Sequence, residues 1–297
     1  KLAYLKILFG KERLSESNGM AQAVVIAGIL FGTLLFSVGF EYLYQLLPAA
    51  VDNKNTVTAS MWPLGLGLIS LALLQLVFVY RIPEKNELLE AAEPLGQERA
   101  SVTPRLSVFY LLKDKQLLIP VLGLALFWSV GQGMLAAFPA FAKAHAGISN
   151  AAVIQAILAS TAVGIAVGAF WVGKFSKGTI NLKLVPLGVT GLALGLWSLT
   201  FLSTAQAFAS VYCLMGLSSA FLIVPLNAYI QWQAVENTLG GVIAASNFFQ
   251  NIAMLTMLGL TIVFALAHFD SQHLLQMMAL LTTVAGGAIA WAVMRFN

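Results

Sequence analysis

Side-chain amides are the groups of this chain that could do chemistry in an apolar setting. Asn247, Gln250 and Asn251 are spaced by three and four residues, which puts them on one face of a helix. At 1.5 Å per residue, Asn251 lies about 15 Å from Gly240, near the middle of a bilayer. Such amides either hydrogen-bond to a neighbouring helix or line a polar cavity, and both interpretations stay open here.

Two further pairs of polar side chains repeat the spacing of one helical turn. Asn227 and Gln231 lie near the end of one apolar stretch, and Trp128 and Gln132 lie within an earlier one. The same two interpretations apply to them.

Catalytic chemistry is not predicted. His145, His268 and His273 fall at the ends of apolar stretches, and no Cys accompanies them at metal-ligand spacing. No Gly-rich phosphate loop leads into a helix with a following Lys and Ser or Thr. We expect no enzyme activity, no metal and no cofactor. No apolar stretch holds an Asp, Glu or His well inside it, so a coupling carboxylate would have to lie outside this sequence, or movement is uncoupled.

The elements that carry these amides are predicted to be membrane-spanning helices. The chain is 59% hydrophobic and only 9% charged, unlike a soluble domain. Its apolar stretches are long and unbroken, which excludes the alternating pattern of a barrel strand. Eight spans are predicted, near Ala21–Phe40, Ser60–Tyr80, Leu117–Phe141, Ala151–Phe175, Leu182–Leu202, Phe208–Ile230, Gly241–Leu266 and His273–Met294.

Charge is concentrated in one central loop, Arg81–Gln116, which holds half of the 12 acidic residues. If the eight spans alternate, 14 of the 16 Lys and Arg fall on one side, and only Lys54 and Lys143 fall on the other. The positive-inside rule then places both termini and the central loop in the cytoplasm. Retained cytoplasmic bases also explain the net charge of +4, so no nucleic-acid partner is expected.

Three local patterns add expectations. Ser17-Asn18-Gly19 supplies N-cap chemistry before the first span. Small residues four apart at Gly28/Gly32, Gly164/Gly168 and Gly191/Gly195 allow helix backbones to approach closely, either as static packing or as a sliding surface. Arg105–Lys115 sets apolar residues against Lys113 and Lys115, as a helix lying on the membrane surface would.

The segment Val224–Gln231 followed by Asn247–Leu255 resembles the lysophospholipid transporters of the major facilitator superfamily. Leu126–Trp128 with Gly131, and Ser17-Asn18-Gly19, resemble the same family in the same order along the chain. The similarity runs from about Leu14 to the C-terminus. It extends to the transporter segment that some bacteria fuse to acyltransferase and acyl-ligase domains.

The resemblance implies an all-α fold of twelve helices in two halves, of which the first four are absent here. Residues 1–80 would be a remnant of the N-terminal half, 81–116 the central loop, and 117–297 the C-terminal six-helix half. The implied function is transport of lysophosphatidylethanolamine-like lipids across the bacterial inner membrane by alternating access. Implied partners are the lysophospholipid, membrane lipids and an acyltransferase or acyl-ligase. Lacking one wall of the path, the 297-residue chain alone is expected not to transport.

Site residues follow from helical spacing together with the resemblance. Those expected to face the central cavity are Trp128, Gln132, Asn227, Asn247, Gln250 and Asn251. Phe248, Phe249 and Met254 would accommodate an acyl chain. Two departures concern the head group: a neutral run, Gly133-Met134-Leu135, and Gln250 stand where relatives carry charge.

Two alternatives remain. One is a facilitator of another small solute, although a sugar carrier would have more polar groups on its spans. The other is a non-transporting membrane partner of an acyltransferase.

Overall fold

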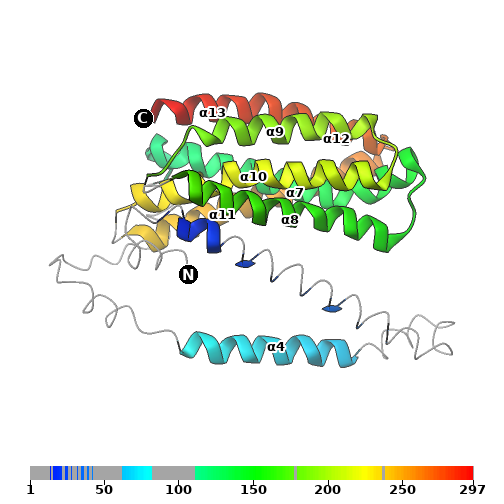
Figure 1. Cartoon of the computed structure of the whole chain (residues 1–297), viewed down its shortest axis with the longest axis horizontal. Coiled ribbons are helices and arrows are strands. Elements are labelled where there is room, and N and C mark those ends of the chain that lie inside the picture. Colours follow the sequence, from blue (N-terminus) through cyan, green and yellow to red (C-terminus); the bar gives the residue numbers. More distant parts are fainter. Residues whose placement is uncertain are drawn as a thin grey trace. The chain divides into compact units, whose positions relative to one another are not determined.

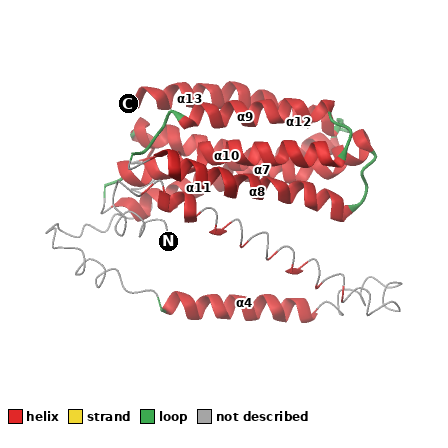
Figure 2. Cartoon of the chain, in the orientation of Figure 1, coloured by secondary structure: helices red, strands yellow, loops and turns green. Residues whose placement is uncertain are grey.

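The computed structural model describes residues 62–81, 111–176, 179–235 and 238–296, together with 14, 16–21, 24, 25, 28, 32, 35, 36, 39 and 42. Within this described part every regular element is a helix and there is no strand (Figure 2). The predicted all-α class is therefore confirmed.

The chain divides into two units, Lys1–Ile26 with Arg99–Asn297, and Ala27–Glu98. The second unit contains α4 (Trp62–Tyr80), which coincides with the second predicted span. Its apolar side chains are exposed almost throughout, as expected for a helix surrounded by lipid. The described positions of the first predicted span, up to Tyr42, are also helical. The rest of that span, and the acidic part of the central loop, lie outside the described residues.

The first unit contains a bundle of long apolar helices (Figure 1). Six of them, among the described residues, are long and apolar enough to cross a membrane, in agreement with the last six predicted spans. They are α7 (Lys115–Ala146), α8 (Ala151–Ser176), α9 (Leu184–Ser198) with a 3₁₀ turn at Leu199–Phe201, α10 (Ala205–Gln233), α11 (Leu239–Leu266), and α12 (Ser271–Leu281) continued through a π-helical segment (Thr282–Gly286) into α13 (Gly287–Val293) and a last turn, Met294–Phe296.

Polar side chains fix where several of these helices begin. Asp114 caps α7 by accepting a hydrogen bond from the Gln116 backbone N–H at 2.9 Å. Thr204 and Asp270 cap α10 and α12 in the same manner. Such caps satisfy backbone donors that have no partner in the first turn. α7 ends at Gly147, whose φ of 67° is a left-handed conformation that glycine adopts without strain.

α10 packs between α8 and α9 with almost no space between the backbones. A methyl group added at Gly168 of α8 would lie 2.6 Å from the Leu217 carbonyl oxygen, and one at Gly164 would overlap the Cys213 carbonyl. The close approach of backbones predicted from Gly164 and Gly168 is therefore confirmed. On the other side, a methyl group at Gly188 of α9 would lie 2.7 Å from the Ser218 carbonyl oxygen, whereas the predicted pair Gly191 and Gly195 packs against the side chains of Ser218 and Met215.

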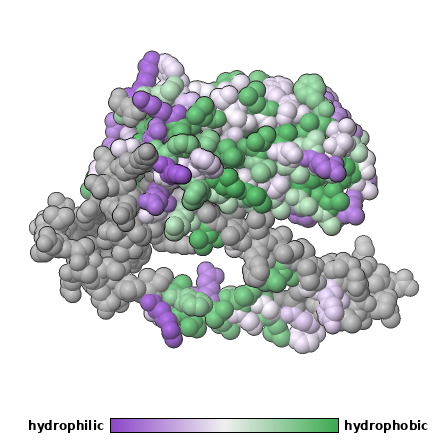
Figure 3. Space-filling view, in the orientation of Figure 1, coloured by the Kyte–Doolittle hydropathy of each residue, from purple (hydrophilic) through white to green (hydrophobic). Residues whose placement is uncertain are grey.

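The two ends of the bundle differ in charge. One end, called the basic end below, carries the exposed side chains of Lys113, Lys115, Lys174, Lys183 and Arg295. The opposite end carries Lys143, the three His residues and Asp270. Hydrophobic surface covers much of the middle of the bundle in Figure 3, and the most hydrophilic groups lie toward its ends.

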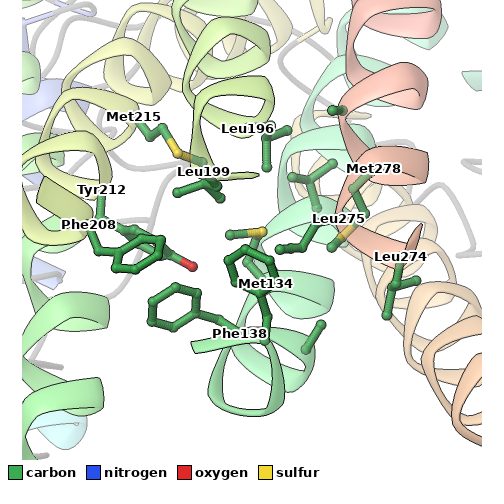
Figure 4. Close-up of a cluster of buried hydrophobic side chains, with 14 of the residues drawn as sticks. Met134, Phe138, Leu196, Leu199, Phe208, Tyr212, Met215, Leu274, Leu275 and Met278 are labelled. Carbon is green, nitrogen blue, oxygen red and sulfur yellow. The ribbon is translucent and has the colours of Figure 1, made fainter. Parts of the chain in front are cut away.

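A cluster of aromatic and Met side chains fills the half of the bundle away from the basic end (Figure 4). Phe138 of α7 is fully buried and meets Phe208 and Tyr212 of α10, with ring centroids 5.4 and 4.7 Å apart. Met134 and Met278 continue the same cluster toward α12. This packing joins α7, α10 and α12.

Two local expectations need correction. Asn18 is not an N-cap, because Leu14 and residues 16–21 are already helical and the Asn18 Nδ2 donates to the Leu14 carbonyl oxygen at 2.8 Å. The helix predicted to run through Lys115 on the membrane surface is interrupted at Asp114, and Leu111 is fully buried. Residues 105–110 lie outside the described part. The prediction for Gly28 and Gly32 stays a prediction, because both belong to the second unit.

Candidate functional site

α7 approaches α11 closely where Gly133 lies near Met257. A methyl group added at Gly133 would lie 2.5 Å from the Met278 Sδ atom of α12 and 2.9 Å from the Met257 Cγ atom of α11, so these two Met side chains occupy the space that a larger residue would need. Both helices begin at the basic end. Trp128 and Asn251 are therefore at nearly the same depth, each about 20 Å from the start of its helix at 1.5 Å per residue.

The same contact is a reference point for the direction in which each side chain projects from α7 or α11. Counted at about 100° per residue from the Gly133–Met257 contact, Trp128 and Gln132 project from the same side of α7. Asn247 and Asn251 project from the matching side of α11 by the same count. All four side chains are exposed or partly exposed. By this count the four residues share one side of the α7–α11 pair, which is called the amide face below.

Side-chain burial on the α7 side of the amide face decreases with distance from the basic end. On α7 one helical stripe runs through Leu117, Val121, Leu124, Trp128 and Leu135. The first three are fully buried, whereas Trp128 is 37% and Leu135 is 59% exposed. Trp128, packed edge-on against Phe127 with centroids 5.1 Å apart, therefore marks the depth at which the stripe changes from buried to exposed.

Gln250 stands at the edge of the amide face and is held in place by its own helix. Its Nε2 donates to the Ser246 Oγ atom at 2.8 Å, and Ser246 is buried. This bond leaves the Gln250 carbonyl oxygen free to accept another hydrogen bond. Ser246 was not predicted from the sequence, although a Ser four residues before a Gln on a helix indicates that the two side chains are neighbours.

Asn227 is not joined to the other five residues. It is partly buried on α10, and its Nδ2 donates to the Ile223 carbonyl oxygen of the same helix at 2.9 Å. Its neighbour Leu226 packs near Gly123, which lies on the side of α7 away from the amide face. No hydrogen bond connects any two of the six predicted site residues within the described part of the chain.

The residues predicted to hold an acyl chain separate into two groups. By the same helical count, Met254 lies on the amide side of α11 and Phe249 on the opposite side. Phe248 is exposed at the edge and packs edge-on against Phe249, with centroids 6.1 Å apart.

A buried pair of amides lies at the basic end and was missed as a pair. Gln231 Nε2 donates to Asn18 Oδ1 at 2.7 Å, and Asn18 Nδ2 lies 3.3 Å from Gln231 Oε1. Asn18 is 0% and Gln231 is 1% exposed. The sequence places both residues next to apolar stretches, but no spacing rule joins residues this far apart.

The amide face carries no titratable side chain, and none of the described residues form a cluster of three or more His, Cys, Asp or Glu. Bases approach aromatic rings at the basic end instead. The Arg295 guanidinium lies 3.5 Å from the centre of the Trp291 ring, and the Lys174 ammonium lies 5.9 Å from that of Trp171. The face can therefore offer hydrogen bonds, one indole ring and apolar surface, but no general acid or base.

Comparison with known proteins gives one family. Residues 2–257 match the sequence model described as Major Facilitator Superfamily. This match includes α7 to α10 and most of α11, and it confirms the resemblance drawn from the sequence.

Curated relatives narrow the likeness further. The lysophospholipid transporter LplT of Serratia proteamaculans (strain 568) is 28% identical over 261 residues, which cover 84% of this chain and 58% of that protein. LplT of Salmonella paratyphi B is 28% identical over 257 residues, and LplT of Salmonella typhi is 27% identical over 256, with the same coverage. The chain thus spans less than two thirds of the length of these relatives.

Proposed function

Because this chain belongs to the Major Facilitator Superfamily, we propose that it forms part of a transporter that moves lysophospholipids across a membrane by alternating access. It is a multi-pass membrane protein, with six apolar helices among its described residues. The named relatives are lysophospholipid transporters, and the likeness extends over 84% of the chain.

The observation that carries this proposal is the composition of the amide face. A lysophospholipid has a polar, zwitterionic or anionic head and one long apolar tail. Asn247, Asn251 and Gln132 offer amides to phosphate and amine groups, and the Trp128 ring can attract an ammonium group. Leu135 and Met254 offer apolar surface beside them. A face that is partly polar and partly apolar matches a substrate of the same character.

A water-soluble solute is less well matched to this surface. Carriers of sugars would need hydrogen-bond partners all around the ligand, because each unpaired polar group costs free energy in a dry site. The amide face supplies polar groups only at a few positions separated by exposed apolar residues such as Leu135 and Leu255.

We further propose that the basic end faces the cytoplasm of a bacterium and that the membrane is its inner membrane. Loops with many Lys and Arg are retained on the cytoplasmic side. Arg295 and Lys174 each lie beside a Trp ring. This combination suits the membrane interface, where the ring can lie against lipid while the charged group reaches water.

The test is uptake of a labelled lysophospholipid by spheroplasts. Cells that make the protein and cells from which its gene has been deleted are compared with radiolabelled lysophosphatidylethanolamine and, as a control solute, labelled maltose. The proposal requires that only the lipid is taken up faster by the cells with the gene. Equal lipid uptake in the two strains would refute it, and gene-dependent maltose uptake would favour the solute carrier.

A further inference from the structure

The Asn18–Gln231 pair differs from the other polar contacts of the described helices. Each side chain contributes an oxygen and an N–H group to the other, and both are sealed from solvent. The remaining hydrogen bonds between two side chains of different helices, such as Gln233 to Gln116 and Trp197 to Thr283, are exposed. The pair is thus the one buried connection of this kind between distant parts of the described chain.

The pair stands where the segment around Asn18 meets α8 and α10. A methyl group added at Gly19 would lie 2.7 Å from the Ala169 carbonyl oxygen of α8. One at Gly173, a turn further along α8, would lie 3.4 Å from the Glu16 Cα atom. Residues 16–19 therefore rest directly on the α8 backbone, and Asn18 reaches from there to α10.

Burial along the α7 stripe is complete at this same end of the bundle. Leu117, Val121 and Leu124 line the amide-face stripe of α7 toward the basic end and are fully buried. Leu135, further along that stripe, is 59% exposed. The amide pair thus lies at the end of the bundle where this stripe is buried.

Amides are a costly choice for a permanent contact but a suitable one for a contact that opens. In a fixed apolar junction, two apolar side chains of similar shape would serve as well or better than a hydrogen-bonded pair. When a junction opens to water, however, separated amides exchange their mutual hydrogen bonds for bonds to water at little net cost. Separated apolar side chains would instead expose surface that water disfavours.

We propose that Asn18 and Gln231 form a latch that closes the basic end of the transport path in the state described here and separates when that end opens. This inference rests on the proposed function, in which the segment around Asn18 belongs to the N-terminal half and α10 to the C-terminal half. The latch is one of the contacts that these halves exchange during alternating access.

The test uses two reporter cysteines on the α7 stripe in a Cys213→Ala background, in membranes that contain the protein. Val121→Cys reports on the closed end and Leu135→Cys on the open end, each through its rate of reaction with a water-soluble maleimide. Asn18→Leu, Gln231→Leu and the double variant remove the latch. Ser219→Ala is the matched control, because Ser219 is buried on α10 but bonds only to the Met215 carbonyl of its own helix.

Loss of the latch should shift the protein toward the state with an open basic end. The expected result is a rise of the Val121→Cys rate and a fall of the Leu135→Cys rate, each about fivefold, as the loss of one net hydrogen bond predicts. Each single variant leaves one buried amide without its partner, whereas the double variant places two apolar side chains together. The double variant should therefore shift the rates less than either single variant. Ser219→Ala should leave both rates unchanged.

Other results overturn the inference. If both rates rise, the variant has loosened the bundle and the pair is a packing contact. If neither rate changes, the pair does not control access. The labelling measures cysteine reaction rates and not lipid transport. Its result is therefore independent of the uptake of lysophospholipid by spheroplasts, and the two proposals are judged separately.

Discussion

Gly133 of α7 and Met257 of α11 meet so closely that any side chain at position 133 would displace the methionine. Met278 of α12 lies nearer still to that position, so Gly133 packs against Met side chains from two helices. Counted from the contact with Met257, Trp128 and Gln132 lie on the same side as Asn247 and Asn251.

Replacing Gly133 by Leu should therefore disturb both stability and the site. Overpacking of a filled position costs about 1–3 kcal/mol, so the melting temperature of the purified protein in detergent should fall. Gly131→Leu is the matched control. Gly131 is exposed two residues away, and a methyl group there meets no described atom within 4 Å. Equal melting temperatures for the two variants would contradict the role given to the contact.

The amides of α11 are expected to act on the substrate rather than on the fold. Asn247→Leu and Asn251→Leu should each lower lysophosphatidylethanolamine uptake about tenfold, since a hydrogen bond to a charged group contributes about 1.5–3 kcal/mol. Both side chains are exposed, so protein levels in the membrane should not change.

The control for this pair is Thr256→Val. Thr256 is exposed on the other side of α11 and donates only to the Ile252 carbonyl of its own helix. Its loss should leave uptake unchanged. Uptake that survives both amide substitutions, or falls equally in the Thr variant, would remove the amide face from the account.

Ser246 is expected to matter through Gln250. Ser246→Ala deletes the oxygen that accepts from Gln250 Nε2 and frees the amide to rotate. We expect the apparent affinity for lysophospholipid to weaken about fivefold, the effect of one hydrogen bond, with the maximal rate unchanged. In a Gln250→Leu background the same Ser substitution should have no further effect. Additive losses in the double variant would show that Ser246 acts by another route.

The orientation can be tested by labelling from either side of the membrane. In a Cys213→Ala background, Ser149→Cys at the end away from the bases should react with an impermeant maleimide in intact spheroplasts. Lys183→Cys at the basic end should react only after the membrane is broken. Both positions are exposed, so a difference in rate reports the side of the membrane. The reverse pattern would place the bases outside.

The sequence was sufficient for the helices and for which residues share a helix face, because apolar length and a 3.6-residue period are local properties. It thus predicted the six long spans and the spacing of Asn247 and Asn251. It could not predict the rotation of α7 against α11, which depends on Gly133 meeting Met257. Nor could it predict that Asn227 would turn back to its own helix.

Asn18 shows the limit of local reasoning most clearly. Beside Ser17 and Gly19 it has the composition of an N-cap, since short polar side chains favour helix starts. In the structure the helix begins earlier, and the amide bonds to Gln231 instead. The Asn18 side chain could cap a helix or bond to a distant residue, and the contact with Gln231 determines which of these it does. No pattern near residue 18 indicates that partner.

The central claim is that a lysophospholipid lies on the amide face between α7 and α11. A lysophosphatidylethanolamine that carries a photoreactive diazirine near its head group tests this directly, when the labelled residues are mapped by mass spectrometry. We predict labels concentrated on the exposed residues around Trp128–Leu135 and Asn247–Leu255, reduced by excess unlabelled lipid. Labels spread evenly over the exposed side chains of α8 and α9 as well, with no competition, would contradict the account.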